Sequence, residues 1–205
     1  MRLEYDAPMS TTETVPKKLF TRDEFQRILD AGIFPTNKRY ELIRGEIIEM
    51  PRIAGAHAGR VNFLTRLFTS RLGESVIVSI QNPMAIDDYS EPKPDVTILT
   101  PLQEFFDLSI PEPQDVLLLV EVSYTTIRYD TKIKKPLYAE AGVAEYWVLD
   151  IKGDAVIVLT EPSEGEYRRQ ETYRRGQTIT AKALPAFTFS IDEILGPVHE
   201  SAKTI

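Results

Sequence analysis

The segment that most constrains the fold is DVLLLVEVSYTTIRYDTKIKKPLY, residues 115–138. Its apolar run, residues 116–120, has the length and branching of a strand that is buried on both faces of a sheet. Glu121 follows this run directly, and a charged group there is costly to desolvate unless a partner pairs with it. A polar break and a basic stretch come next. An acid that ends a core strand, with lysines downstream, indicates a chemical site rather than packing alone.

Length and composition favour a single soluble domain. The chain has 205 residues, of which 42% are hydrophobic, so a full-sized core is available. It has no cysteine, which excludes a disulfide framework, thiolate metal sites and cysteine nucleophiles. No apolar run approaches the length of a membrane span, and the N-terminal segment has no apolar signal region. We therefore expect a soluble, cytoplasmic protein.

The net charge of −7 argues mildly against a general nucleic-acid coat protein, whose affinity comes mostly from cations on phosphate. It does not exclude a nuclease with a locally basic cleft, because carboxylates that hold a metal ion also count as negative.

The pattern along the chain predicts a single α/β domain. Residues 1–18 are polar and aperiodic and are expected to form a flexible N-terminal arm. We expect a single domain at residues 19–197 and a C-terminal tail at residues 198–205. A capping box at residues 21–24 opens a short helix, and residues 39–50 read as two strands around Arg44 and Gly45. Further predicted elements are a helix at residues 55–72 and strands at residues 75–80, 96–99, 145–151, 155–160, 166–173 and 184–190.

Asp95 and Glu121 carry the first functional hypothesis. Asp95 starts one apolar β-run and Glu121 ends another. If these strands are antiparallel neighbours, both carboxylates lie at the same edge of the sheet. Two carboxylates so close repel one another unless a cation stands between them, and Mg²⁺ or Mn²⁺ prefers such oxygen ligands. A nearby lysine would complete a site for phosphodiester hydrolysis, because its ammonium can orient the attacking water or stabilise developing negative charge.

Structural readings of the same residues stay open. Asp95 is compatible with a simple turn at the start of a strand, and Glu121 with pairing to an arginine such as Arg128. Asp130 and Lys134 stand four residues apart, as in a surface ion pair on a helix. Pro136 leaves the direction of Lys134 open, because proline is tolerated mainly in the first turn of a helix.

His57 and Glu41 are harder to assign. His57 precedes Val61 and Leu64 by four and seven residues, which favours a hydrogen-bonded histidine in the core. Glu41 lies in a predicted strand, and alternation does not decide whether it points toward the site. With two histidines and no cysteine, a tetrahedral zinc site is disfavoured. No Walker loop, dinucleotide fingerprint or G-x-S-x-G elbow is present.

Several short motifs in a fixed order resemble one family. They are YELIRG at 40–45, EPKPD at 91–95, EVS at 121–123, YD at 129–130, Lys134, LY at 137–138 and AGVAEYW at 141–147. This order is similar to the Uma-two family, classed with the PD-(D/E)XK restriction-endonuclease-like nucleases, and the resemblance covers residues 20–195. It implies a restriction-endonuclease-like α/β core, a central mixed β-sheet flanked by helices.

The resemblance also implies site residues. Asp95 matches the family's first acid, Glu121 its second, and Lys134 its lysine, while Glu41 and His57 match recurrent positions. One departure from the superfamily pattern is Ser123, because a typical member has its lysine two residues after the second acid. We expect this lysine to have moved to the following helix, at Lys134 or, if that helix is rotated differently, at Lys132.

The leading hypothesis is an endonuclease that uses Mg²⁺ or Mn²⁺ and acts on DNA rather than RNA, as a homodimer. Asp95, Glu121 and the backbone carbonyl of Val122 are expected to bind the metal, Lys134 to assist the water, and Glu41 to be a further acid. Residues of a second tier are His57, Ser123, Asp130 and Lys132. Candidates for phosphate contact are Arg60, Arg66, Arg128 and Lys132.

Two alternatives remain at this level. The first is a non-catalytic, dimeric interaction module on a nuclease-like scaffold, favoured by the acidic net charge and by Ser123. The second is a nuclease for RNA or for a structured junction. Apolar residues at 155–160 and 187–189 are compatible with a dimer face or with the core.

Overall fold

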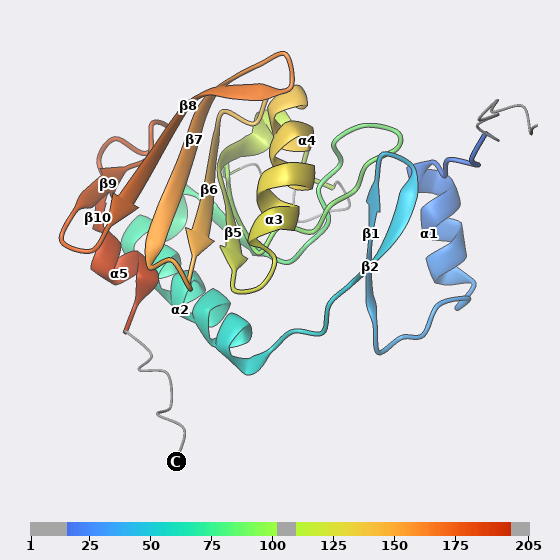
Figure 1. Ribbon diagram of the computed structural model, residues 1–205, viewed down its shortest axis with the longest axis horizontal. Helices are drawn as coiled ribbons and strands as arrows, with labels where there is room; N and C mark the ends of the chain where they lie inside the picture. The colour runs from blue at the N-terminus through green and yellow to red at the C-terminus, as the bar shows by residue number, and fades with distance from the viewer. Residues whose placement is uncertain (1–15, 102–109, 198–205) are drawn as a thin grey trace, which may run out of the picture.

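A six-stranded sheet forms the centre of the computed structural model, which describes residues 16–101 and 110–197 (Figure 1). The predicted tail and residues 1–15 of the predicted arm lie outside the described residues. The strand order is β3-β4-β5-β6-β7-β8, and all neighbours are antiparallel except the parallel pair β5 and β6. The expected central mixed sheet is therefore confirmed. Its strands are β3 Ile77–Ile80, β4 Val96–Leu99, β5 Val116–Ser123, β6 Glu145–Asp150, β7 Ala155–Ser163 and β8 Glu166–Arg174.

The predicted buried strand β5 lies in the middle of this sheet. Leu118, Val120 and Val122 face the cluster formed with helix α2 (Gly55–Leu72), whereas Leu119 packs on the opposite face with α4 (Lys135–Glu140). Because side chains alternate along a strand, Glu121 shares the face of Leu119. The strand continues to Ser123, so the prediction that Glu121 ends it is wrong by two residues.

The connection from β5 to β6 crosses one face of the sheet, as a parallel pair requires. It contains the short helix α3 (Ile127–Tyr129), one π-helical turn (Asp130–Lys134) and then α4. Pro136 lies in the first turn of α4, where its missing N–H costs little. Gly142 has φ +78° and follows α4, as expected for a glycine that stops a helix.

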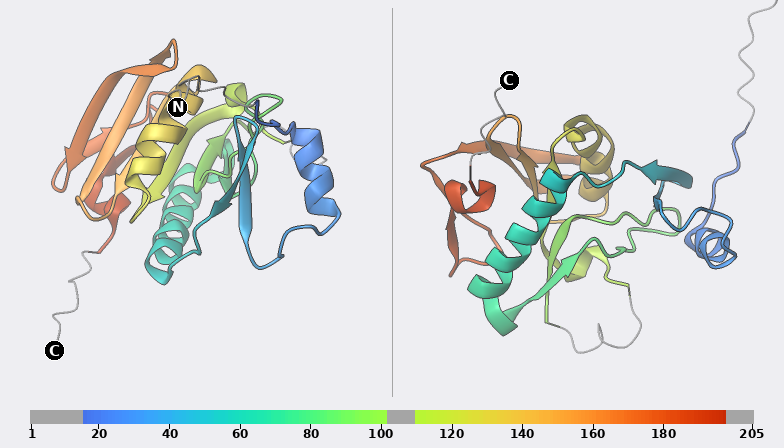
Figure 2. Two further views of the ribbon diagram at one scale, coloured as in Figure 1. Left: turned by 45° about the vertical axis from the view of Figure 1, so that its right-hand side comes forward. Right: turned by 90° about the horizontal axis from the view of Figure 1, so that it is seen from below.

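The N-terminal part lies beside the sheet rather than in it (Figure 2). Thr21 and Glu24 form the predicted capping box of α1 (Arg22–Asp30). Strands β1 (Arg39–Ile43) and β2 (Glu46–Met50) form the predicted hairpin. An isolated bridge between Leu42 and Glu91 joins this hairpin to the segment before β4.

The C-terminal part covers the α2 face of the sheet. It consists of β9 (Thr178–Thr180), β10 (Thr188–Ser190) and α5 (Ile191–Leu195), which begins with a capping box formed by Ser190 and Glu193. Two 3₁₀ turns, at Gly73–Ser75 and Pro113–Asp115, precede β3 and β5. The first of them delays the start of β3 to Ile77, and β10 is shorter than the strand predicted at residues 184–190.

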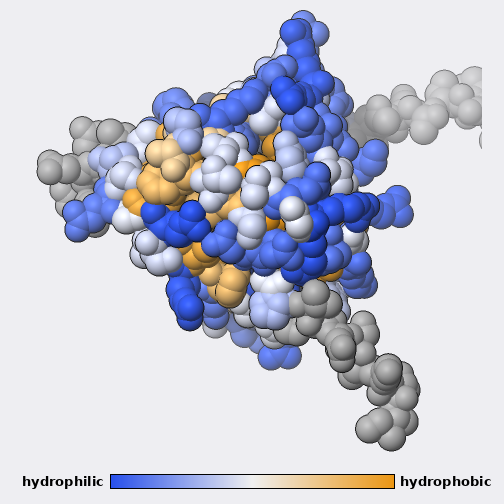
Figure 3. All heavy atoms as spheres, turned by 90° about the vertical axis from the view of Figure 1, so that its left-hand side faces the viewer, coloured by the Kyte–Doolittle hydropathy of each residue, from blue (hydrophilic) through white to orange (hydrophobic). Residues whose placement is uncertain are grey.

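The apolar residues at 155–160 and 187–189, which the sequence left open between a dimer face and the core, belong mostly to the core. Val156, Leu159 and Phe189 are fully buried. The surface on the β8 and β9 side is mainly hydrophilic and has a smaller apolar area near its centre (Figure 3). Of the helices in the described parts of the chain, none is long and apolar enough to cross a membrane.

Candidate functional site

The register of β4 and β5 brings Asp95 and Glu121 together. The strands are antiparallel with Val96 opposite Val120, so the residue before β4 lies beside the end of β5. The backbone N–H of Asp95 donates to Oε2 of Glu121 at 3.3 Å, and the N–H of Val122 donates to Oδ2 of Asp95 at 2.9 Å. The expectation that the two acids meet at one sheet edge is confirmed. The metal-binding role assigned to the carbonyl of Val122 stays a prediction.

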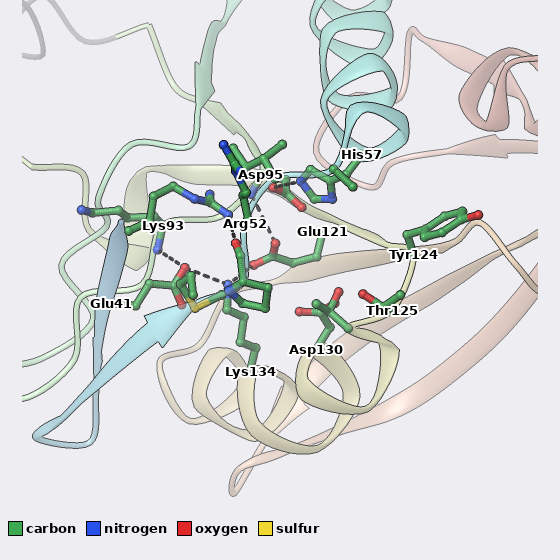
Figure 4. Close-up of a pocket in the computed structure, with 16 residues that line it drawn as sticks. Glu41, Arg52, His57, Lys93, Asp95, Glu121, Tyr124, Thr125, Asp130 and Lys134 are labelled. Atoms are coloured by element: carbon green, nitrogen blue, oxygen red, sulfur yellow. Dashed lines mark hydrogen bonds and ion pairs between the residues drawn. The ribbon is translucent and has the colours of Figure 1, made fainter. Parts of the chain in front are cut away.

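Lys134 reaches the same point from the π-helical turn (Figure 4). Its Nζ lies 2.8 Å from Oε1 of Glu121 and 3.1 Å from Oε1 of Glu41, and the residue is only 2% exposed. The reading of Asp130 and Lys134 as a surface ion pair is therefore wrong, as is the pairing of Glu121 with Arg128. Lys132 is exposed and does not line the cavity, so the wide turn selects Lys134.

Glu41 points into the site from β1. Its Oε1 accepts hydrogen bonds from Nζ of Lys134 and, at 3.1 Å, from the backbone N–H of Lys93. Its Oε2 is buried and has no hydrogen-bond partner among the described residues. A buried carboxylate oxygen without a donor is costly, so this atom marks a place where a further polar or cationic group would be stabilised.

His57 does not lie in the core. It belongs to the first turn of α2, before the packed stripe that starts at Val61, and its side chain is 17% exposed. Its Nε2 lies 2.9 Å from Oδ1 of Asp95. The prediction of a core histidine is wrong because the helix enters the sheet face only one turn later. The hydrogen bond to Asp95 raises the pKa of His57 despite partial burial.

The pKa of Asp95 is lowered. Burial pushes it upward, but hydrogen bonds from His57, Gln81 and Val122 to the carboxylate outweigh this effect. Nε2 of Gln81 donates to Oδ1 at 3.0 Å. Gln81 was not predicted as a site residue; it directly follows β3 and adopts a positive φ of 52°, which only the structure reveals.

Ser123 and Asp130 hold the crossover to the sheet. The hydroxyl of Ser123 donates to Oδ2 of Asp130 at 2.6 Å, and the hydroxyl of Thr126 donates to the same oxygen at 2.8 Å. Burial nevertheless raises the pKa of Asp130. Ser123 thus anchors the turn that carries Lys134.

The cluster contains more acids than bases. Four acids, Glu41, Asp95, Glu121 and Asp130, are buried around one buried ammonium. Burial, together with the charges of Asp95, Asp130 and Glu41, raises the pKa of Glu121 well above its ordinary value. Burial alone would lower the pKa of Lys134, but the surrounding carboxylates raise it well above its ordinary value. Lys134 is therefore held as a cation. Tyr138 adds a hydrogen bond to Oε1 of Glu121 at 3.0 Å.

The four acids, Lys134 and His57 line a cavity of about 210 Å³. The cavity is also lined by three basic residues that were not predicted: Arg39, Arg52 and Lys93. Arg39 begins the β1–β2 hairpin and Arg52 follows its end, while Lys93 lies two residues before Asp95. None of the four predicted phosphate contacts lines this cavity. Arg60 is buried and donates to the carbonyl of Pro197, while Arg66, Arg128 and Lys132 are exposed elsewhere.

Within the described ranges, no three or more histidine, cysteine, aspartate or glutamate side chains are arranged to hold a metal ion. A metal site among these residues would therefore have to combine two carboxylates with backbone carbonyls or water, as Mg²⁺ sites often do.

Comparison with known proteins identifies a similar solved structure and a protein family. Among solved structures, the crystal structure of "a putative nuclease belonging to DUF820" from Anabaena variabilis ATCC 29413 superimposes with a TM-score of 0.66 and 17% sequence identity. The match covers 86% of this chain and 97% of that chain and shows a shared fold. No curated protein matches significantly. The family model Uma2, described as "Putative restriction endonuclease", matches residues 22–192. The chain therefore belongs to the Uma2 family and has a restriction-endonuclease-like fold.

Proposed function

We propose that this protein is a divalent-metal-dependent endonuclease that hydrolyses phosphodiester bonds, preferentially in DNA. One observation carries the proposal: Asp95, Glu121 and Lys134 come from three separate segments and meet in one buried cluster. Family membership supports the class of reaction. The cavity beside the cluster carries Arg39, Arg52 and Lys93, which suit an anionic backbone.

The residues fit a hard divalent cation. The candidate metal ligands are oxygen atoms, and the buried acids outnumber the buried ammonium. Oε2 of Glu41 has no hydrogen-bond partner within the described residues. Asp95 and Glu121 would hold the ion, with the carbonyl of Val122 as a further ligand and Glu41 as an additional acid. When bound, Mg²⁺ or Mn²⁺ polarises a phosphoryl oxygen and lowers the pKa of a water molecule.

The protein's own groups supply orientation and charge. His57 and Gln81 hold Oδ1 of Asp95 from one side, and the N–H of Val122 holds Oδ2 from the other. Tyr138 and Lys134 hold Oε1 of Glu121. The ammonium of Lys134 is the group that would orient the attacking water and stabilise negative charge that develops on the phosphate.

The test is a Mn²⁺-dependent cleavage assay on plasmid DNA, single-stranded DNA and RNA. Asp95→Asn and Lys134→Met are expected to lower the rate by about 100-fold or more, the scale of loss when a positioned charge is removed from a transition state. Lys132→Met is the matched control, because Lys132 is exposed two residues away. Circular dichroism and thermal melting verify that each variant is folded. Equal rates in wild type and both site variants would contradict the proposal.

A non-catalytic, dimeric interaction module is the second candidate. Ser123 donates to Asp130 where the superfamily has a lysine, and Lys134 is engaged by two carboxylates. Both observations are compatible with a site kept for stability. Calorimetric titration with Mn²⁺ separates the two candidates, because a structural cluster should show no binding that depends on Asp95. Sedimentation of the same samples measures the proposed homodimer directly.

A further inference from the structure

An exposed aromatic side chain lies at the mouth of the candidate site. Tyr124 follows β5 directly and lines the same cavity as Glu121, yet it is 41% exposed. In Figure 4 its ring lies to one side of the acids, and Lys93 lies on the other side. Tyr124 has no role in holding Asp95, Glu121 or Lys134, and it remains unexplained by the chemistry proposed above.

The parallel pair β5 and β6 positions a cation beside this ring. Ser123 is opposite Asp150, and the N–H of Ile151 donates to the carbonyl of Ser123 at 3.0 Å. The turn after β6 is thereby held against the segment that follows β5. Nζ of Lys152, in that turn, lies 5.1 Å from the centre of the Tyr124 ring. The ring and the ammonium therefore form one feature at this sheet edge.

Basic residues also extend from the cavity along the β1–β2 hairpin. The cavity adjoins a hollow of about 500 Å³ along the β1–β2 hairpin, and the two share Arg39 and Arg52. Lys38 and Glu49 also line the second hollow and pair with each other at 2.7 Å, so its excess positive charge comes from Arg39 and Arg52. An aromatic platform combined with a positively charged groove is the arrangement by which proteins bind single-stranded nucleic acid. A base in the interior of a duplex cannot use such a platform, because both of its faces are already stacked on neighbouring bases.

We propose that Tyr124, flanked by Lys152, is a stacking platform for an unpaired base, and that Arg39 and Arg52 bind the backbone beyond the site. The substrate class is then a nucleic acid that is single-stranded next to the scissile phosphate. This inference rests on the proposed nuclease function and goes beyond it, because an endonuclease with these acids and lysine could equally act on an intact duplex.

The test measures binding of the full chain to a short fluorescein-labelled DNA strand and to the corresponding blunt duplex. Ca²⁺ replaces Mn²⁺ to neutralise the acids, and a gel confirms that the DNA stays intact. Tyr124→Ala is expected to weaken single-strand binding by roughly 5- to 150-fold, which corresponds to about 1–3 kcal/mol for one stacked base. Tyr124→Phe, which keeps the ring, should bind like wild type. Duplex binding should change by less than about twofold, since every base except those of the two terminal pairs is already stacked on both faces.

Tyr89→Ala is the matched control. Tyr89 is 45% exposed, like Tyr124, but does not line the cavity, so both DNA forms should bind this variant as they bind wild type. Equal binding of Tyr124→Ala and wild type to the single strand would overturn the inference. An equal loss on strand and duplex would overturn it too, because it would indicate a backbone contact. If wild type bound neither form and cleaved no nucleic acid, the proposed function itself would fail, whereas cleavage with unchanged Tyr124→Ala binding would refute the platform alone.

Discussion

At the scale of single residues, Lys134 is the most informative side chain. It is 2% exposed and contacts carboxylates from β1 and β5, so it joins the N-terminal hairpin to the central sheet as well as to the candidate site. A buried ion pair contributes little compared with apolar packing, but removal of one partner leaves the other charge unpaired and is costly. Stability and the proposed chemistry therefore depend on the same ammonium.

We expect Lys134→Met to lower the free energy of unfolding by about 3–5 kcal/mol at neutral pH, the cost of breaking a buried pair. Glu121 already has a raised pKa, and loss of the ammonium raises it further. A raised carboxyl pKa favours the folded state at low pH and loses this contribution as pH rises. The deficit of the variant should consequently shrink when urea unfolding is repeated at about pH 5. Lys132→Met should stay within about 0.5 kcal/mol of wild type as a surface change; equal losses in both variants would contradict the assignment.

The raised pKa of His57 predicts how stability depends on pH. Its pKa in the folded protein is raised above the ordinary 6.5 by Asp95, so its stabilising contribution is complete below 6.5 and is lost as pH rises through the folded value. The pKa of Asp95 is lowered, so its contribution is lost only as pH falls below the ordinary 3.8. In EDTA, the melting temperature of wild type should fall relative to that of His57→Gln as pH rises above 6.5. Parallel curves for the two proteins would show that the pair does not form.

At the scale of elements, the crossover between β5 and β6 decides which lysine enters the site. A π-helical turn shifts the direction of side chains relative to a regular α-helix, and such turns occur often at functional sites. Here the turn ends at Lys134, directly before the helix whose first turn contains Pro136. The bonds of Ser123 and Thr126 to Asp130 fix where the turn begins.

We expect Ser123→Ala to destabilise the protein by about 1–3 kcal/mol, because it leaves the buried Asp130 with one fewer donor. Nuclease activity should fall as well, since the turn that carries Lys134 loses an anchor. Urea unfolding and the cleavage assay measure the two effects. Thr125→Ala is the neighbouring control, because Thr125 is exposed and should leave stability nearly unchanged. A fully stable and active Ser123→Ala would show that the anchor is dispensable.

At the scale of the whole molecule, the distribution of charge matters more than its total. The chain is acidic overall, with a net charge of −7, yet the candidate site concentrates carboxylates inside and arginine and lysine at its rim. A divalent cation that binds only the folded protein stabilises it by mass action. Metal binding and global stability should therefore be coupled.

Mn²⁺ at 100 times its dissociation constant should add about 2.7 kcal/mol to the free energy of unfolding. For a protein of this size that corresponds to an increase in melting temperature of roughly 5–11 °C relative to EDTA. Asp95→Asn should lose most of this increase, whereas Asp88→Asn, an exposed acid outside the cavity lining, should keep it. The same increase in both variants would place the ion elsewhere.

Much of this organisation can be predicted from the sequence, because it depends on local patterns. The apolar run before Glu121, the glycine turn at Gly45 and the capping boxes at Thr21 and Ser190 each depend on neighbouring residues. The meeting of Asp95 and Glu121 followed from one assumption about strand direction, which the antiparallel register satisfies.

Tertiary structure alone decided the rest, because those features depend on contacts between distant segments. The direction of Glu41 came from the packing of the hairpin, and the exposure of His57 from the point at which α2 meets the sheet. Gln81 reaches Asp95 only through the pairing of β3 with β4. Lys134 is one of three lysines at residues 132–135, and the π-helical turn selected it, since a change in helical pitch rotates every following side chain.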